Sequence, residues 1–216
     1  IDAPLSLPAL HVPAHGGHAQ LLADVLALGP ANDRPFPRGT DLVDLAARNA
    51  PLQSKKPTRQ TEKEWQRQGV NVRSTLWAGP RGGAAFTAAS LMLLARARRP
   101  VWPWKDAPGM IVEAFPAGQL RAWGLPHTSY GPPSRPEHKT EAERRIRRDR
   151  RRTILKEVAA RTGVSVSRVF EDTMTDCTDA LDAYLAVFGA RAAANRTLKL
   201  DKPANWKTEG AIAVHA

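Results

Sequence analysis

Residues 179–193, which read DALDAYLAVFGARAA, indicate both a helix of the fold and a candidate metal-binding site. Apolar side chains recur every three or four positions, so the pattern predicts a helix over residues 177–194. Asp179 and Asp182 are three positions apart and therefore share one helix face. Capping of the helix N-terminus explains Asp179 adequately, but it explains Asp182 poorly because that residue lies a turn further in. The acidic pair favours a metal-binding helix.

Two other short segments each carry one carboxylate. Residues 1–5 read IDAPL and residues 110–116 read MIVEAFP, so each combines an apolar, strand-like run with an acid and a proline. A buried carboxylate is costly unless a cation meets it, and a shared divalent ion meets several at once. The three segments together indicate metal-dependent phosphodiester chemistry. The alternative is that these acids have only structural roles.

The charge of the chain agrees with a polyanionic partner. It has 216 residues, with 32 Lys and Arg against 21 Asp and Glu, and a net charge of +11. A surplus of positive charge of this size favours nucleic acid, either DNA or RNA, as the binding partner over an anionic membrane surface. Seven arginines lie between Arg144 and Arg152 on a helix predicted over residues 139–162. They could form a solvated helix face, but like charges this dense repel one another unless an anion neutralises them. We therefore expect phosphate contacts from Arg144, Arg145, Arg147, Arg148, Arg151 and Arg152.

Several bulk features narrow the class of protein. The single cysteine, Cys177, excludes an intrachain disulfide and a cysteine-rich zinc site, which fits a cytoplasmic protein. The longest apolar run, residues 84–95, is too short to span a bilayer, so no membrane association is expected. The chain opens at Ile1 on what resembles a buried central strand. This favours a domain whose N-terminal strands are missing.

The order of elements predicts an α/β fold in a single domain over residues 1–216. Strands are predicted over residues 1–8, 110–115 and 211–214. Helices are predicted over residues 16–29, 40–47, 58–68, 84–98, 139–162, 164–172 and 177–194, with a short one around Gln119. A loop-rich insertion is expected at about 30–83, and a basic linker and helix at about 126–162.

Three further patterns receive structural interpretations. His15 and His18 flank two glycines, and we predict an exposed loop because no other ligand for a metal lies nearby in sequence. Residues 79–83 lack the Gly-Lys-Ser/Thr ending of a phosphate loop, so nucleotide binding is not predicted there. Trp102, Trp104 and Trp123 are expected to cover the core, with base stacking as the alternative.

The chain resembles a known family, the domain of unknown function 429, described as predicted nucleases with a ribonuclease-H-like fold. The resemblance is carried, in order, by IDAPLSLP at 1–8, TRQTE at 58–62, VEAFPA at 112–117, DALDA at 179–183 and EGAI at 209–212. It implies a central sheet flanked by helices. It also implies a site formed by Asp2, Glu113 and Asp182, with Asp179 beside them. Arg59 either forms an ion pair with Glu62 on one helix face or, as the resemblance implies, lies near the acidic cleft.

The expectation is therefore a metal-dependent nuclease. Asp2, Glu113 and Asp182 would bind Mg²⁺ or Mn²⁺, the ions that hard oxygen ligands select, and Asp179 would be an additional or outer ligand. Arg59 would contact nucleic acid. One alternative is a nucleic-acid-binding module without catalysis. Another is a structural or interaction protein whose acidic residues only cap helices.

Overall fold

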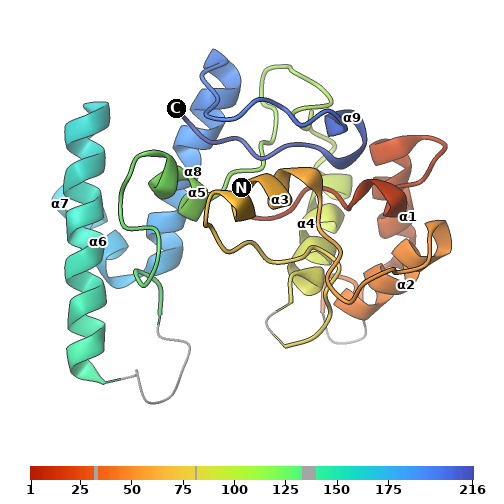
Figure 1. The fold of residues 1–216 in the computed structure, drawn as a ribbon, viewed down its shortest axis with the longest axis horizontal. Coiled ribbons are helices and arrows are strands. Elements are labelled where there is room, and N and C mark those ends of the chain that lie inside the picture. Colours follow the sequence, from red (N-terminus) through yellow and green to blue (C-terminus); the bar gives the residue numbers. More distant parts are fainter. Residues whose placement is uncertain (32–33, 81, 133–139) are drawn as a thin grey trace. The chain divides into compact units, whose positions relative to one another are not determined.

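The computed structural model describes residues 1–31, 34–80, 82–132 and 140–216. These residues form helices joined by loops (Figure 1). Part of the predicted linker, residues 133–136, and the predicted start of the basic helix at Lys139 lie outside the described residues. In chain order the elements are η1 (Ala9–His11), α1 (Gly17–Leu28), α2 (Gly39–Asn49), α3 (Gln60–Arg67), α4 (Ala84–Ala97), α5 (Pro116–Ala122), α6 (Glu141–Thr162), α7 (Arg168–Asp176), α8 (Thr178–Asn195) and α9 (Trp206–Glu209).

The chain packs as two compact units. Unit 1 comprises Ile1 and residues 3–114 and 200–213, whereas unit 2 comprises Asp2 and residues 115–199 and 214–216. Unit 1 is therefore made of segments from both ends of the chain, and most of unit 2 is one continuous segment between them.

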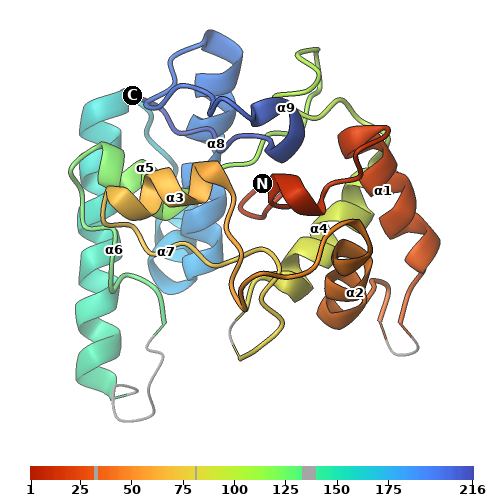
Figure 2. The same cartoon turned by 45° about the vertical axis from the view of Figure 1, so that its right-hand side comes forward.

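The core of unit 1 is built where helix α4 packs against α1 and α2 (Figure 2). Leu21, Leu42 and Leu91, one from each helix, are fully buried there. The start of α2 lies so close to α4 that a Cβ atom on Gly39 would be 2.7 Å from the backbone nitrogen of Ala85. Only glycine allows this approach of the two helices.

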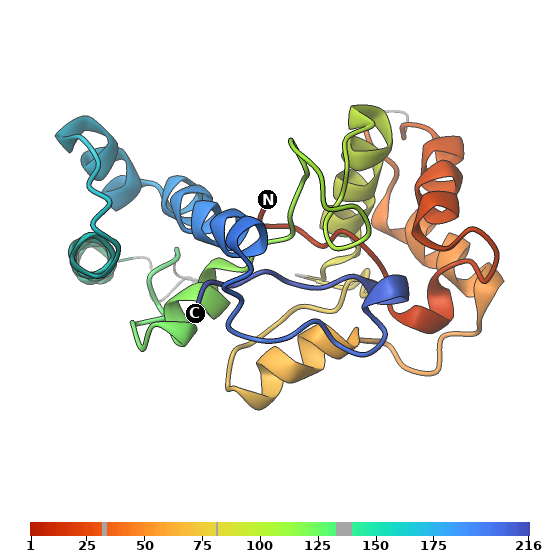
Figure 3. The same cartoon turned by 90° about the horizontal axis from the view of Figure 1, so that it is seen from above.

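The core of unit 2 is formed by α5, α6, α7 and α8; Figure 3 views α6 end-on. Leu181, Leu185 and Phe188 of α8 are buried, and the ring of Trp123 packs edge-on against Phe188 with centroids 5.0 Å apart. Edge-to-face contact is a favourable geometry for aromatic pairs. The apolar face of the predicted 177–194 helix is confirmed as the face that makes this core.

The predicted α/β fold with a ribonuclease-H-like central sheet is wrong. Among the described residues, extended segments meet only at isolated bridges, which pair Val101 with Ile111, Ala114 with Ala213, and Leu198 with His215. The strands predicted over residues 1–8, 110–115 and 211–214 do not form a sheet. Prolines explain part of this result, because Pro4 and Pro8 cannot donate to a ladder and Pro116 already stands in the first turn of α5.

The helices were predicted more accurately, because the 3.6-residue period is a strong signal over long segments. Helices α1, α4, α6 and α8 lie within one or two residues of their expected bounds in the described chain. Helix α2 begins before the predicted cap Thr40; its N-cap is Arg38, whose backbone N–H donates to Asp41 at 2.8 Å. Helix α7 begins four residues later than the 164–172 prediction. No helix of the described residues is long and apolar enough to cross a membrane.

Candidate functional site

In unit 1, the segment 58–62 places a buried arginine at the start of α3. Arg59 is the N-cap residue, and Glu62, three positions later, accepts a hydrogen bond from the Arg59 backbone N–H at 2.9 Å. Glu62 also accepts from Arg59 Nε at 3.0 Å. The local sequence therefore fixes the arginine twice, through its backbone and through its side chain.

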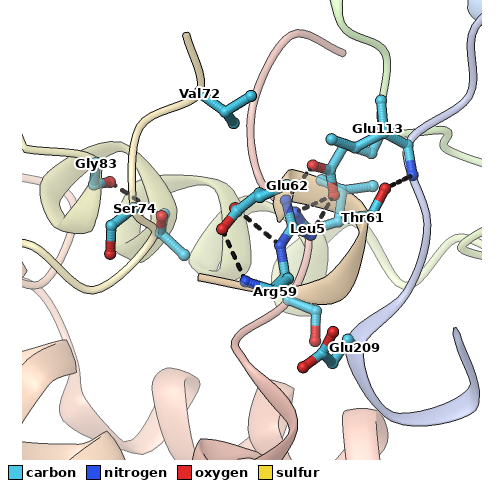
Figure 4. Close-up of polar contacts among 12 residues, drawn as sticks. Leu5, Arg59, Thr61, Glu62, Val72, Ser74, Gly83, Glu113 and Glu209 are labelled. Atoms are coloured by element: carbon cyan, nitrogen blue, oxygen red, sulfur yellow. Dashed lines mark hydrogen bonds and ion pairs between the residues drawn. The ribbon is translucent and has the colours of Figure 1, made fainter. Parts of the chain in front are cut away.

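The rest of the Arg59 guanidinium bonds to Glu113 (Figure 4). Nη1 donates to Glu113 Oε2 at 2.8 Å and Nη2 donates to Oε1, which is the two-pronged geometry that a guanidinium forms with a carboxylate. The backbone N–H of Leu5 adds a third bond, to Glu113 Oε2 at 2.9 Å. Three separate chain segments are thus joined through one carboxylate.

The ionic group formed by Arg59, Glu62 and Glu113 is removed from water. The exposed fractions are 1% for Arg59, 0% for Glu62 and 4% for Glu113. Burial opposes the charge on Arg59, but the two neighbouring carboxylates outweigh it, so the arginine pKa is raised. Burial raises the pKa of Glu62, with Arg59 acting in the opposite direction and Glu113 adding to the rise. Burial is therefore the main cause of the raised pKa of Glu62, and the shared cation Arg59 limits the rise.

A third buried acid, Glu209, holds two backbone groups of the same unit. Its Oε1 accepts from the N–H of Ala9 at 2.7 Å, and its Oε2 accepts from the N–H of Gln60. Sequence reasoning assigned no role to Glu209. The signal was present, because Glu209 opens the last of the five segments on which the family resemblance rests.

In unit 2, Asp182 lies against Tyr130. The Tyr130 hydroxyl donates to Asp182 Oδ1 at 2.9 Å. Burial raises the pKa of Asp182 from 3.8 to about 7, the Tyr130 bond partly offsets this, and the charges of Asp2 and Asp179 raise it further. Burial and the charge of Asp182 also raise the pKa of Tyr130. The pKa of Asp182 thus lies near neutral pH, mainly because the side chain is buried and in part because two other acids are near it.

The structure groups the predicted acidic residues only in part. Asp2, Asp179 and Asp182 belong to unit 2 and influence one another electrostatically, whereas Glu113 belongs to unit 1 and is bonded to Arg59. Across residues 1–31, 34–80, 82–132 and 140–216, no group of three or more His, Cys, Asp or Glu side chains could hold a metal ion. Arg59 would have to leave both carboxylates to reach nucleic acid.

The basic residues of α6 divide into two sets. Arg144, Arg145, Arg148 and Arg152 are exposed, whereas Arg147 is half-buried and Arg151 is 6% exposed. Arg151 Nε donates to the Thr175 carbonyl at 2.6 Å, which ties α6 to α7. The cluster is therefore a basic surface with one buried arginine beneath it.

Three other sequence predictions can be compared with the structure. His18 is not in an exposed loop: it lies in α1, bonds to the Leu5 carbonyl at 2.7 Å and stacks on Trp104 with ring centroids 3.7 Å apart. Burial lowers the pKa of His18 to about 4. Trp102 and Trp123 are buried, as the core interpretation predicted, and His15 is exposed.

The chain belongs to the family described as protein of unknown function, DUF429, whose sequence model matches residues 1–204. The match includes Asp2, Arg59, Glu62, Glu113, Asp179, Asp182 and the arginines of α6, but not Glu209, and it supports the resemblance seen in the sequence. No curated protein and no solved structure matches the chain.

Proposed function

We propose that this protein is a divalent-metal-dependent nuclease that hydrolyses phosphodiester bonds of DNA or RNA. The observation that carries the proposal is the environment of Asp182. Its pKa is raised to about 7 by burial and by the charges of Asp2 and Asp179. A bound cation offsets the charge of neighbouring acids and so favours the ionised form of a buried carboxylate.

The donor set of unit 2 fits Mg²⁺ or Mn²⁺ in one specific way. The described residues offer no group of three ligands, but Mg²⁺ commonly binds through one or two carboxylates, several waters and the phosphates of its substrate. Asp182 with Asp2 or Asp179 would supply the carboxylates. A bound ion would position the phosphate and make a water more acidic.

Glu113 fits a metal less well than the aspartates do. Both of its oxygens accept hydrogen bonds from Arg59, and one also accepts from Leu5. Binding an ion would require the loss of a buried ion pair, which is costly. The proposal therefore assigns the ion to the aspartates of unit 2 and a supporting role to Glu113.

The residues of the chain itself have definable tasks in this proposal. Tyr130 orients Asp182 by donating to one carboxylate oxygen. Asp182 would hold the cation through its ionised carboxylate, a form that a pKa of about 7 makes accessible at neutral pH. Helix α6 supplies exposed arginines in the same unit, which attract the polyanion.

The test is cleavage of internally labelled DNA and RNA oligonucleotides in Mn²⁺. Replacing Asp182 with Asn should reduce the rate at least about 100-fold, beyond the loss typical of groups that only support a metal ligand. Asp172→Asn, on exposed surface of α7, is the matched control and should leave the rate unchanged. Equal rates in wild type and Asp182→Asn would refute the assignment.

A second candidate is a nucleic-acid-binding protein without catalysis. It is favoured by the lack of a three-ligand metal group in the part of the chain that the structure describes. Tight binding of oligonucleotides in EDTA, together with no cleavage in Mg²⁺ or Mn²⁺, would select this candidate. If the protein neither binds nor cleaves oligonucleotides, both candidate functions are wrong. The remaining alternative is then a structural or interaction protein.

A further inference from the structure

Unit 2 contains a small cavity surrounded by guanidinium groups. It has a volume of about 220 Å³. Four arginines of one helix face line it, together with three residues from neighbouring segments. The lining residues are Arg144, Arg147, Arg148, Arg151, Pro132, Asp176 and Thr178. Arg145 and Arg152, which belong to the same basic helix, are not among them.

The buried side of the cavity is formed by Arg151. Its Nε donates to the Thr175 carbonyl at 2.6 Å and its Nη1 donates to the Tyr130 carbonyl, so the side chain is anchored on two sides. Neither acceptor carries a formal charge. Burial lowers the pKa of Arg151; Asp176 opposes this effect, and Arg148 and Arg147 add to it. Arg148 and Arg147 therefore act against the charge on Arg151, whereas Asp176 favours it.

The three remaining arginines are each paired with one acid. Arg148 Nε lies 2.8 Å from Asp176, Arg144 Nη1 lies 3.3 Å from Glu141, and Arg147 Nε lies 3.5 Å from Glu143. Among the described residues that line the cavity, Asp176 is the one carboxylate. Ion pairs as exposed as those of Arg144 and Arg148 are weak and exchange readily with other anions.

Arg147 gives the most direct evidence that the cavity binds an anion. Its Nη1 donates to the Gly131 carbonyl at 2.7 Å, but its Nε is buried without a hydrogen-bond partner among the described residues. An unmet buried N–H of a charged group is unfavourable, and an acceptor in the cavity would satisfy it. The remaining question is which acceptor the cavity suits.

The size and charge of the cavity select the ligand. Its volume of about 220 Å³ is below the roughly 300–1,000 Å³ of pockets that enclose drug-sized ligands, so it suits a phosphate group better than a whole nucleotide. Four arginines against one aspartate leave the lining strongly positive. A terminal phosphate carries about −1.5 to −2 charges at neutral pH, more than an internal diester. Guanidinium groups also match phosphate oxygens geometrically.

We propose that this cavity binds a phosphate monoester, and that its ligand is the terminal phosphate of a nucleic acid strand. The choice of nucleic acid as the source rests on the proposed function. The binding of a monoester stands on the cavity alone. Exposed Arg144 and Arg148 would contact the incoming phosphate first, and Arg147 and Arg151 would bind it within the cavity.

The test compares two oligonucleotides of one sequence with the same internal fluorescent label, one phosphorylated at both ends and one with hydroxyl ends. Binding is measured by fluorescence anisotropy in EDTA, so that cleavage cannot contribute. The wild type should bind the phosphorylated strand at least about fivefold more tightly, and inorganic phosphate should compete with that preference. Arg148→Gln and Arg144→Gln should each remove the preference.

Arg152→Gln is the matched control, because Arg152 is on the same helix and equally exposed but does not line the cavity. The Arg152→Gln variant should bind both oligonucleotides more weakly by the same factor, and it should keep the preference for the phosphorylated one. The proposal is overturned if the wild type shows no preference, or if Arg148→Gln and Arg144→Gln keep it while folding normally by circular dichroism.

The source of the phosphate is tested separately by thermal unfolding with inorganic phosphate. A rise in Tm that Arg148→Gln abolishes, without oligonucleotide binding, would support the monoester site and contradict nucleic acid as its source. No rise in Tm and no end preference would overturn the site itself. Loss of Mn²⁺-dependent cleavage would affect only the nuclease proposal.

Discussion

Arg59 and Glu113, 54 positions apart in sequence, meet in a two-pronged ion pair inside unit 1. Both side chains are almost completely buried. The pair joins the start of α3 to the segment before α5, and Leu5 adds its N–H to the same carboxylate. Removing one partner would leave a charge buried without compensation, which is far more costly than losing an exposed pair.

Replacing Arg59 with Gln should therefore lower the free energy of unfolding by about 3–5 kcal/mol, because Glu113 and Glu62 lose their shared cation. Urea denaturation measures this loss. Arg67→Gln is the control on the same helix; its ion pair with Glu64 is exposed, so it should change stability by less than about 1 kcal/mol. Similar losses for both variants would show that the buried pair has no special role.

A second prediction concerns pH and Asp182, whose pKa rises from 3.8 to about 7 on folding. Between these values the folded state binds more protons than the unfolded state, so its stability falls as the pH rises. Asp182→Asn removes this dependence and should gain about 1–3 kcal/mol of stability relative to wild type between pH 5 and pH 8. Chemical denaturation at both pH values measures it. A constant difference between the two proteins would contradict the raised pKa.

His18 gives the opposite pH dependence. Its pKa is lowered from 6.5 to about 4 by burial, so the unfolded state binds more protons in that range and stability falls on acidification. His18→Phe can still stack on Trp104 and cannot be protonated, so its Tm should fall less between pH 7 and pH 4.5. The exposed His15 provides the control, since His15→Gln should follow the wild type at every pH.

Metal binding itself can be checked without any assay of cleavage. Mn²⁺ at pH 7 should raise the Tm of the wild type, because an ion that binds only the folded state stabilises it. Asp182→Asn should lose most of that rise, and Asp172→Asn should keep it. An equal rise in all three proteins would place the ion elsewhere.

The helices of this chain could be predicted from the sequence, whereas the predicted sheet does not form among the described residues. Long segments such as α4, α6 and α8 repeat their apolar positions over several turns, and packing confirmed the periodicity. The runs at residues 1–8 and 110–115 are short, and a short apolar run has no period that distinguishes a ladder from a buried loop. Residues 5–8 and 112–114 are buried without forming a sheet, and in the second run Ile111 and Ala114 each pair at a single bridge.

The partners of the acidic residues were also beyond the sequence. Glu113 was recognised as a buried carboxylate that needs a cation, and its cation is the guanidinium of Arg59. The reasoning from desolvation was sound, but sequence spacing cannot distinguish an ion pair between distant residues from a metal site. For Asp182, in contrast, helix spacing identified an acid whose pKa is raised to about 7.

The divided composition of unit 1 has a consequence for protein synthesis. Glu209 accepts the N–H groups of Ala9 and Gln60, and residues 200–213 belong to the same unit as residues 3–114. A nascent chain leaving the ribosome therefore carries these earlier segments without their acceptor until Glu209 has been added. The helices of unit 2 can assemble meanwhile, so the part made first is completed last.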